Sequence, residues 1–64
     1  MTDAEQARRS HAAGDAVTAG IHYERALVAD PANAALLFDY ALLLMQTGRT
    51  QDAAKILTDV RRLA

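Results

Sequence analysis

The side chains of this sequence that could carry out chemistry are few: two histidines, one serine and scattered acids. His11 and His22 fall on two predicted helices of one hairpin, and Ser10 precedes the first of them. Nucleophilic catalysis needs a nucleophile, a base and a group that orients the base, all converging on one point. No acid is obviously placed to orient either histidine, so the simpler interpretation puts both near the surface. The sequence therefore predicts no catalytic residues and no enzyme activity.

Metal and cofactor chemistry has equally little support. The chain has no cysteine, which excludes disulfides and thiolate metal sites. A metal site made from the two histidines is the lesser alternative. Gly14 and Gly48 stand alone in the sequence, so we interpret them as helix stops and not as part of a phosphate-binding loop. We expect no metal ion and no cofactor.

Charge and hydropathy narrow the range of partners. The net charge is −1, and acids are interleaved with the basic pairs at 8–9 and 61–62, which favours solvated helix surfaces over a nucleic-acid site. The longest apolar stretch, around residues 42–45, is far too short to span a bilayer. The N-terminus is acidic where a signal peptide would be basic. We expect no nucleic acid, no membrane and a cytoplasmic location.

Helix-capping residues divide the chain into four predicted helices. Residues 2–5 have the S/T-x-x-E form of a capping box, and Asp15 and Asn33 are favourable N-cap residues. Pro31 stops the second helix, because the residue before a proline disfavours helix. The helices are expected at about 3–13, 16–29, 34–47 and 51–63, with Thr2 and Thr50 as N-caps of the first and the last.

Short connections decide how these helices are arranged. Linkers of about two to four residues force consecutive helices to be antiparallel neighbours. No segment alternates between apolar and polar residues in the manner of a β-strand. We therefore predict an all-α fold in a single domain, residues 1–64, built from two antiparallel helix–turn–helix hairpins.

An internal repeat of 34 residues relates the two hairpins. The shift superimposes Gly14 on Gly48, Ala7 on Ala41, Ala19 on Ala53, Tyr23 on Leu57 and Ala26 on Val60. The glycines occupy both tight turns, and the paired alanines lie where two helices must approach closely. The last two pairs lie on the inward face of each second helix. The first repeat is expected at about 1–33 and the second at about 34–64.

In these features the sequence resembles the tetratricopeptide repeat (TPR) family, whose units are helix–turn–helix pairs of 34 residues. The segment 23–33, YERALVADPAN, is particularly close to the ending of the second helix in a TPR unit. The residues that fit the first unit are Ala7, Gly14, Ala19, Tyr23, Ala26, Leu27, Asp30 and Pro31. Those that fit the second are Leu37, Tyr40, Ala41, Leu44, Gly48, Ala53, Leu57 and Val60. The resemblance covers essentially the whole chain and implies a short α-solenoid of four helices.

The first helix departs from the family pattern. The polar residues Asp3, Gln6 and Ser10 stand where the second unit has Leu37, Tyr40 and Leu44. The second unit also lacks a closing proline. We therefore expect the first helix to behave like the end of a stack, with a polar outer side.

The third predicted helix is apolar nearly all round. Phe38, Leu42 and Met45 form a second stripe on it, apart from the side that packs within the hairpin. This stripe is either core that the first helix covers or an exposed groove that takes a partner's helix or peptide, and we favour the groove. The resemblance implies that the partner-binding residues are Ala4, Arg8 and His11 in the first unit and Ala35, Phe38, Asp39, Leu42 and Met45 in the second.

Some TPR proteins hold the C-terminal carboxylate of a partner with lysines and asparagines. At the matching positions this sequence has Ala4, Glu5, Arg8, Phe38, Asp39 and Leu42. Only Arg8 is suited to hold a carboxylate. A clamp of this chaperone-binding type is therefore not expected, and a mostly apolar ligand is favoured.

Two repeats are few for a stack in which each repeat buries its apolar face only against its neighbours. We expect the missing neighbour to be another copy, the rest of a longer chain or a different partner. The predicted function is a protein–protein interaction module that binds a helix or peptide through the groove and self-associates. The alternative is an N-terminal accessory TPR domain of a larger bacterial enzyme, which positions a substrate or docks the catalytic domain. A structural mini-repeat without a ligand is the third hypothesis.

Overall fold

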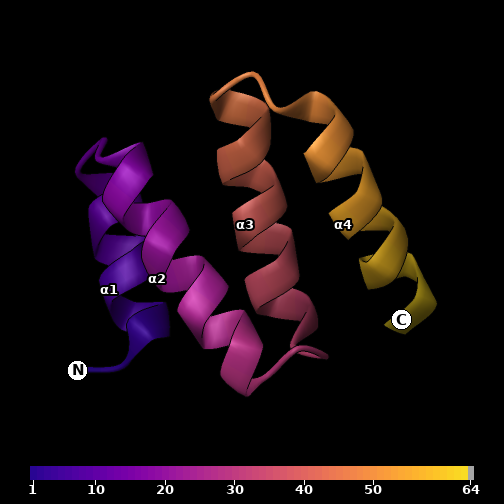
Figure 1. Cartoon of the computed structure of the whole chain (residues 1–64), viewed down its shortest axis with the longest axis horizontal. Coiled ribbons are helices and arrows are strands. Elements are labelled where there is room, and N and C mark those ends of the chain that lie inside the picture. The colour runs from indigo at the N-terminus through magenta and orange to yellow at the C-terminus, as the bar shows by residue number, and fades with distance from the viewer. Residues whose placement is uncertain (64) are drawn as a thin grey trace.

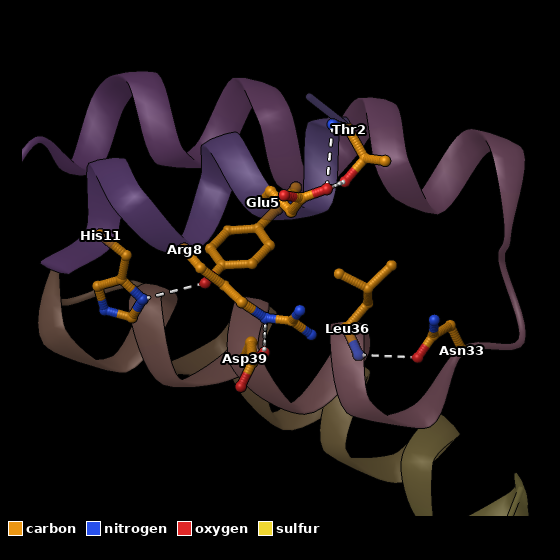
Figure 2. Close-up of polar contacts among 8 residues, drawn as sticks. Thr2, Glu5, Arg8, His11, Asn33, Leu36 and Asp39 are labelled. Atoms are coloured by element: carbon orange, nitrogen blue, oxygen red, sulfur yellow. Dashed lines mark hydrogen bonds and ion pairs between the residues drawn. The ribbon is translucent and has the colours of Figure 1, made fainter.

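Capping hydrogen bonds set the limits of the helices in the computed structural model, which describes residues 1–63 (Figure 1). Thr2 Oγ1 accepts a hydrogen bond from the backbone N–H of Glu5 at 3.2 Å. The Glu5 carboxylate in turn accepts one from the N–H of Thr2 (Figure 2). These two bonds complete the predicted capping box. Asp15 and Asn33 cap the second and third helices through their side-chain oxygens, also as predicted.

The structure confirms the predicted all-α fold. The helices are α1 (Asp3–Ala12), α2 (Ala16–Ala29), α3 (Ala34–Gln46) and α4 (Thr50–Leu63), and residues 1–63 contain no strand. Ala64, the last residue of the predicted second repeat, lies outside the described residues. Within the described part of the chain, no helix has the length and apolar character needed to cross a bilayer.

α4 begins one residue earlier than predicted. Thr50, the predicted N-cap, is instead the first residue of this helix. The carbonyl oxygen of Arg49 accepts a hydrogen bond from the N–H of Ala53 at 3.1 Å, so Arg49 occupies the cap position. Asp52, which pairs with the Arg49 guanidinium at 2.9 Å, supplies the negative charge that the first turn of a helix favours.

Both turns inside the hairpins depend on glycine. Gly14 and Gly48 have φ angles of +82° and +83°, a conformation that residues with a Cβ rarely adopt. After α1, the N–H groups of Gly14 and of the next residue bond back to the carbonyls of His11 and Ser10, which is the Schellman motif. The same motif closes α3 around Gly48. Each of these helices ends one residue before its predicted limit, because the residue before the glycine serves as the C-cap.

The helices pack as two antiparallel hairpins, α1 with α2 and α3 with α4, which meet along α2 and α3 (Figure 1). Within the hairpins lie four alanines that are 0–1% exposed: Ala7, Ala19, Ala41 and Ala53. The bulk of the core comes from larger side chains, chiefly Tyr23, Leu36, Tyr40, Leu43 and Leu44. This arrangement is the short TPR-like solenoid that the repeat predicts.

Tyr40 lies in the contact between the two hairpins. Its ring centroid is 5.8 Å from that of Tyr23, and its hydroxyl donates a hydrogen bond to Glu24 Oε1 at 2.8 Å. Burial and the hydrogen bond to Glu24 together raise the pKa of the Tyr40 hydroxyl from 10.0 to about 12. The folded chain therefore holds this proton more tightly than the unfolded chain does.

Stability should consequently fall between about pH 10 and pH 12. The unfolded chain releases the Tyr40 proton near 10.0 and the folded chain near 12, so the stabilisation is complete below pH 10 and is lost as the pH rises through 12. A shift of this size corresponds to about 2.7 kcal/mol, and solvent screening at this part-buried hydrogen bond reduces the expected loss to about 1–2 kcal/mol. Urea unfolding across this pH range measures the loss. Tyr40→Phe should show a smaller decrease, and an equal decrease would contradict the assignment to Tyr40.

Candidate functional site

The residues predicted to bind a partner come from α1 and α3, which face each other across a groove (Figure 2). Arg8 and His11 of α1 and Asp39 and Leu42 of α3 line one open pocket of about 500 Å³ in this groove. The structure thus brings half of the predicted residues together. The remaining lining residues are Ala12, Tyr23 and Gln46.

Phe38, Leu42 and Met45 form an exposed apolar stripe along α3. Their exposed fractions are 53%, 41% and 50%. They are spaced four and three residues apart, which places them on one side of the helix. α1 packs against α2 and leaves this stripe open, so the alternative that α1 covers it as core is wrong. Leu42 belongs both to the stripe and to the pocket, so the two surfaces are continuous.

The two predicted alanines lie at the margins of this region. Ala35 is exposed on α3, one turn before Phe38. Ala4 is half-buried and lines a separate depression near the N-terminus together with Asp30 and Asn33. Ala4 is therefore not part of the pocket that contains the other predicted residues of α1.

An ion pair crosses the groove. Arg8 Nε donates to Asp39 Oδ2 at 3.2 Å, and their side chains are 52% and 33% exposed (Figure 2). An ion pair this open to solvent contributes little to stability, typically about 0–1 kcal/mol. The ion pair affects which ligands the groove can bind, because Asp39 already neutralises Arg8, the residue that was suited to hold a partner's carboxylate. The pocket is therefore polar at this edge without a net charge from the pair.

His11 lies at the inner wall of the pocket with both ring nitrogens occupied. Nδ1 is 3.2 Å from the hydroxyl of Tyr23, and Nε2 is 2.6 Å from Oε1 of Gln46. A neutral imidazole with its proton on Nε2 satisfies both contacts, because it then donates to Gln46 and accepts from Tyr23. Burial raises the pKa of the Tyr23 hydroxyl, and the charge of Asp39 adds to this effect, so the hydroxyl keeps the proton that it donates. His11 thus positions α1 against α3.

The second histidine has an acidic partner that sequence reasoning missed. His22 Nδ1 lies 2.9 Å from Asp3 Oδ1, so the expectation that no acid is placed to orient either histidine is wrong for His22. The two residues are 19 positions apart, and only the packing of α2 on α1 brings them together. His11 and His22 have different partners. Within residues 1–63, no group of three or more histidines and acids is arranged to hold a metal ion.

Gln46 also lines the pocket, although the sequence interpretation did not include it. It lies four residues after Leu42, on the side of α3 that faces the groove. Helical periodicity from Leu42 was the signal that could have identified it. Its contact with His11 joins the ends of α1 and α3 that are near the hairpin turns.

A family model described as tetratricopeptide repeat matches residues 10–64. The chain therefore belongs to the tetratricopeptide repeat family. The match begins at Ser10, so it omits most of α1, the helix with the least typical sequence. No curated protein and no solved structure matches the chain. Members of this family generally mediate protein–protein interactions, and their repeat domains are generally non-catalytic.

Proposed function

We propose that the groove between α1 and α3 binds a helix or an extended peptide of a partner protein. The observation that carries this proposal is the stripe of Phe38, Leu42 and Met45, which is about half exposed and continuous with a pocket of about 500 Å³. A contiguous apolar patch on a small chain normally marks an interaction site. Methionine suits such a surface, because its flexible side chain adapts to the shape of a ligand.

The chemistry of the groove favours an amphipathic ligand. A helix that presents apolar side chains at i, i+4 and i+7 matches the spacing of the stripe. Polar side chains of the ligand would then face Arg8, Asp39 and Gln46 at the edge of the pocket. The ion pair between Arg8 and Asp39 argues against a site that depends on a free carboxylate.

The remaining features of the predicted function are part of the same proposal. The chain acts as a non-catalytic module, which the engagement of both nitrogens of His11 supports. It binds protein or peptide partners and does not bind nucleic acid, and it is located in the cytoplasm. It also associates with a second copy of itself.

Peptide selection tests the groove directly. A library of short displayed peptides is selected on the chain, and the enriched peptides are measured against Phe38→Glu/Met45→Glu. We expect the variant to bind at least about tenfold more weakly, because two apolar contacts are replaced by buried charge. Val28→Glu is the matched control, since Val28 is 85% exposed and does not line the groove. Peptides that bind the double variant and the wild type equally would contradict the proposal.

A further inference from the structure

A second exposed apolar surface lies on α2, away from the groove. Val17 and Ile21 are 78% and 47% exposed, although both are β-branched aliphatic residues. Together with Gly20, Leu43 and Leu44 they line an apolar cleft of about 310 Å³ between α2 and α3. None of the residues that line this cleft lines the groove pocket between α1 and α3.

Gly20 is a residue that the fold of one copy does not require. It lies in the middle of α2 without a positive φ, where glycine costs about 1 kcal/mol relative to alanine. A Cβ placed there would meet only Leu43 Cδ2, at an ordinary contact distance of 3.9 Å. The equivalent position in the second repeat is Ala54, so this repeat architecture accommodates a methyl group. The missing side chain leaves room for something that approaches α2 from outside.

The charges at the cleft are opposite in sign and lie towards its two ends. Arg49 follows α3, whose C-terminal end lies at the same end of the molecule as the first turn of α2 (Figure 1). Glu24 lies seven residues after Val17, about 10 Å along α2. Arg49 pairs with Asp52 within one copy through Nε and Nη2, but its side chain is 59% exposed and its other N–H groups can bind a second carboxylate. The cleft thus has guanidinium donors beside Val17 and a carboxylate at Glu24, with Gly20 and Ile21 between them.

We propose that a second copy of this chain docks in the cleft, with its α2 antiparallel to the first. A two-fold axis that passes between Gly20 and Ile21 places Glu24 of each copy beside Val17 of the other, and therefore near the other copy's Arg49. The guanidinium of each copy then faces a carboxylate of the other, so the surface is complementary to itself in charge, as a two-fold interface requires. The inference rests on the self-association in the proposed function and assigns it to a surface separate from the groove. The groove then stays free to bind a different partner.

Sedimentation of the chain between about 10 μM and 1 mM tests the pairing, since an interface confined to one helix and its flanks is small and weak. The wild type should change from monomer to dimer in this range, whereas Ile21→Glu should weaken association at least tenfold. Ala29→Glu, at an exposed position on a different side of the same helix, should associate like the wild type. Gly20→Ala should unfold at a higher urea concentration and yet associate several-fold more weakly. If Gly20 had a purely structural role, Gly20→Ala would change stability in urea without weakening association.

Charge exchange identifies the contact between the copies. Glu24→Arg and Arg49→Glu should each weaken association about threefold to tenfold, and the two together should restore it. The bonds that these residues make within one copy, to Tyr40 and Asp52, are not rebuilt by the exchange, so the recovery reports the pair between copies. A chain that stays monomeric at every concentration would overturn the proposal. A dimer that Ile21→Glu leaves intact and Phe38→Glu abolishes would also overturn it. Neither result decides whether the groove binds a peptide.

Discussion

Replacing Tyr23 with alanine should remove most of the stability of this chain. Tyr23 is 1% exposed and is the largest fully buried side chain. Its ring packs against the edge of His11 at 6.0 Å and against Tyr40 at 5.8 Å, so it joins α1, α2 and α3. Loss of a buried aromatic ring typically costs about 3–5 kcal/mol. A chain of 64 residues has a free energy of unfolding of only roughly 3–10 kcal/mol, so we expect Tyr23→Ala to be largely unfolded at 37 °C.

Urea unfolding followed by circular dichroism measures this loss. Tyr23→Phe is the matched control, because it keeps the ring and removes only the hydroxyl that contacts His11 at 3.2 Å. We expect the control to lose about 1 kcal/mol. If the alanine and phenylalanine variants lost the same amount, the hydrogen bond to His11, and not ring packing, would be the main contribution of Tyr23 to stability.

Ala19→Leu should give the second largest loss, about 2–3 kcal/mol. Ala19 of α2 and Ala7 of α1 are both 0% exposed in the hairpin where these helices pack together. Protein interiors are close-packed, so three additional carbon atoms at such a position force the helices apart or the side chain out of a favourable rotamer. Burying a larger apolar side chain is favourable, but that free energy does not offset the strain where no cavity can hold the added atoms.

Two comparisons separate overpacking from other effects of leucine. Ala29→Leu adds the same atoms at an exposed position of α2 and should change stability by less than about 0.5 kcal/mol. Ala53→Leu, the equivalent of Ala19 in the second repeat, should be destabilising to a similar degree, because Ala53 is 1% exposed. A neutral result for Ala19→Leu would show that the two helices can separate without cost, contrary to the packing described above.

The fold was predictable because its signals are local. The capping box at Thr2 and the caps at Asp15 and Asn33 each involve a side chain and a backbone N–H three residues away. The glycine turns are equally local, and the repeat then fixed how the hairpins relate. The prediction of Thr50 as an N-cap was wrong by one residue, and its cause is also local. The ion pair between Arg49 and Asp52 lies at the start of the helix, and the preference of threonine for the cap position does not predict it.

The site was predictable only in part, because its contacts cross between helices. The stripe of Phe38, Leu42 and Met45 lies on one helix, so periodicity reveals it. The contact of His11 with Gln46 joins residues 35 positions apart, and its geometry depends on the angle between α1 and α3. Arg8 and Asp39 were both expected at the groove, but nothing in the sequence indicates that they bind each other.

The main packing contacts all join helices that are consecutive in the chain, and this order has a kinetic consequence. Contacts between sequence neighbours require little loop closure, and helical chains of this kind fold in microseconds to milliseconds. During synthesis on the ribosome, α1 and α2 can therefore close before α3 emerges. The groove needs α1 and α3 together, so a partner can enter it only after the third helix has joined the first two.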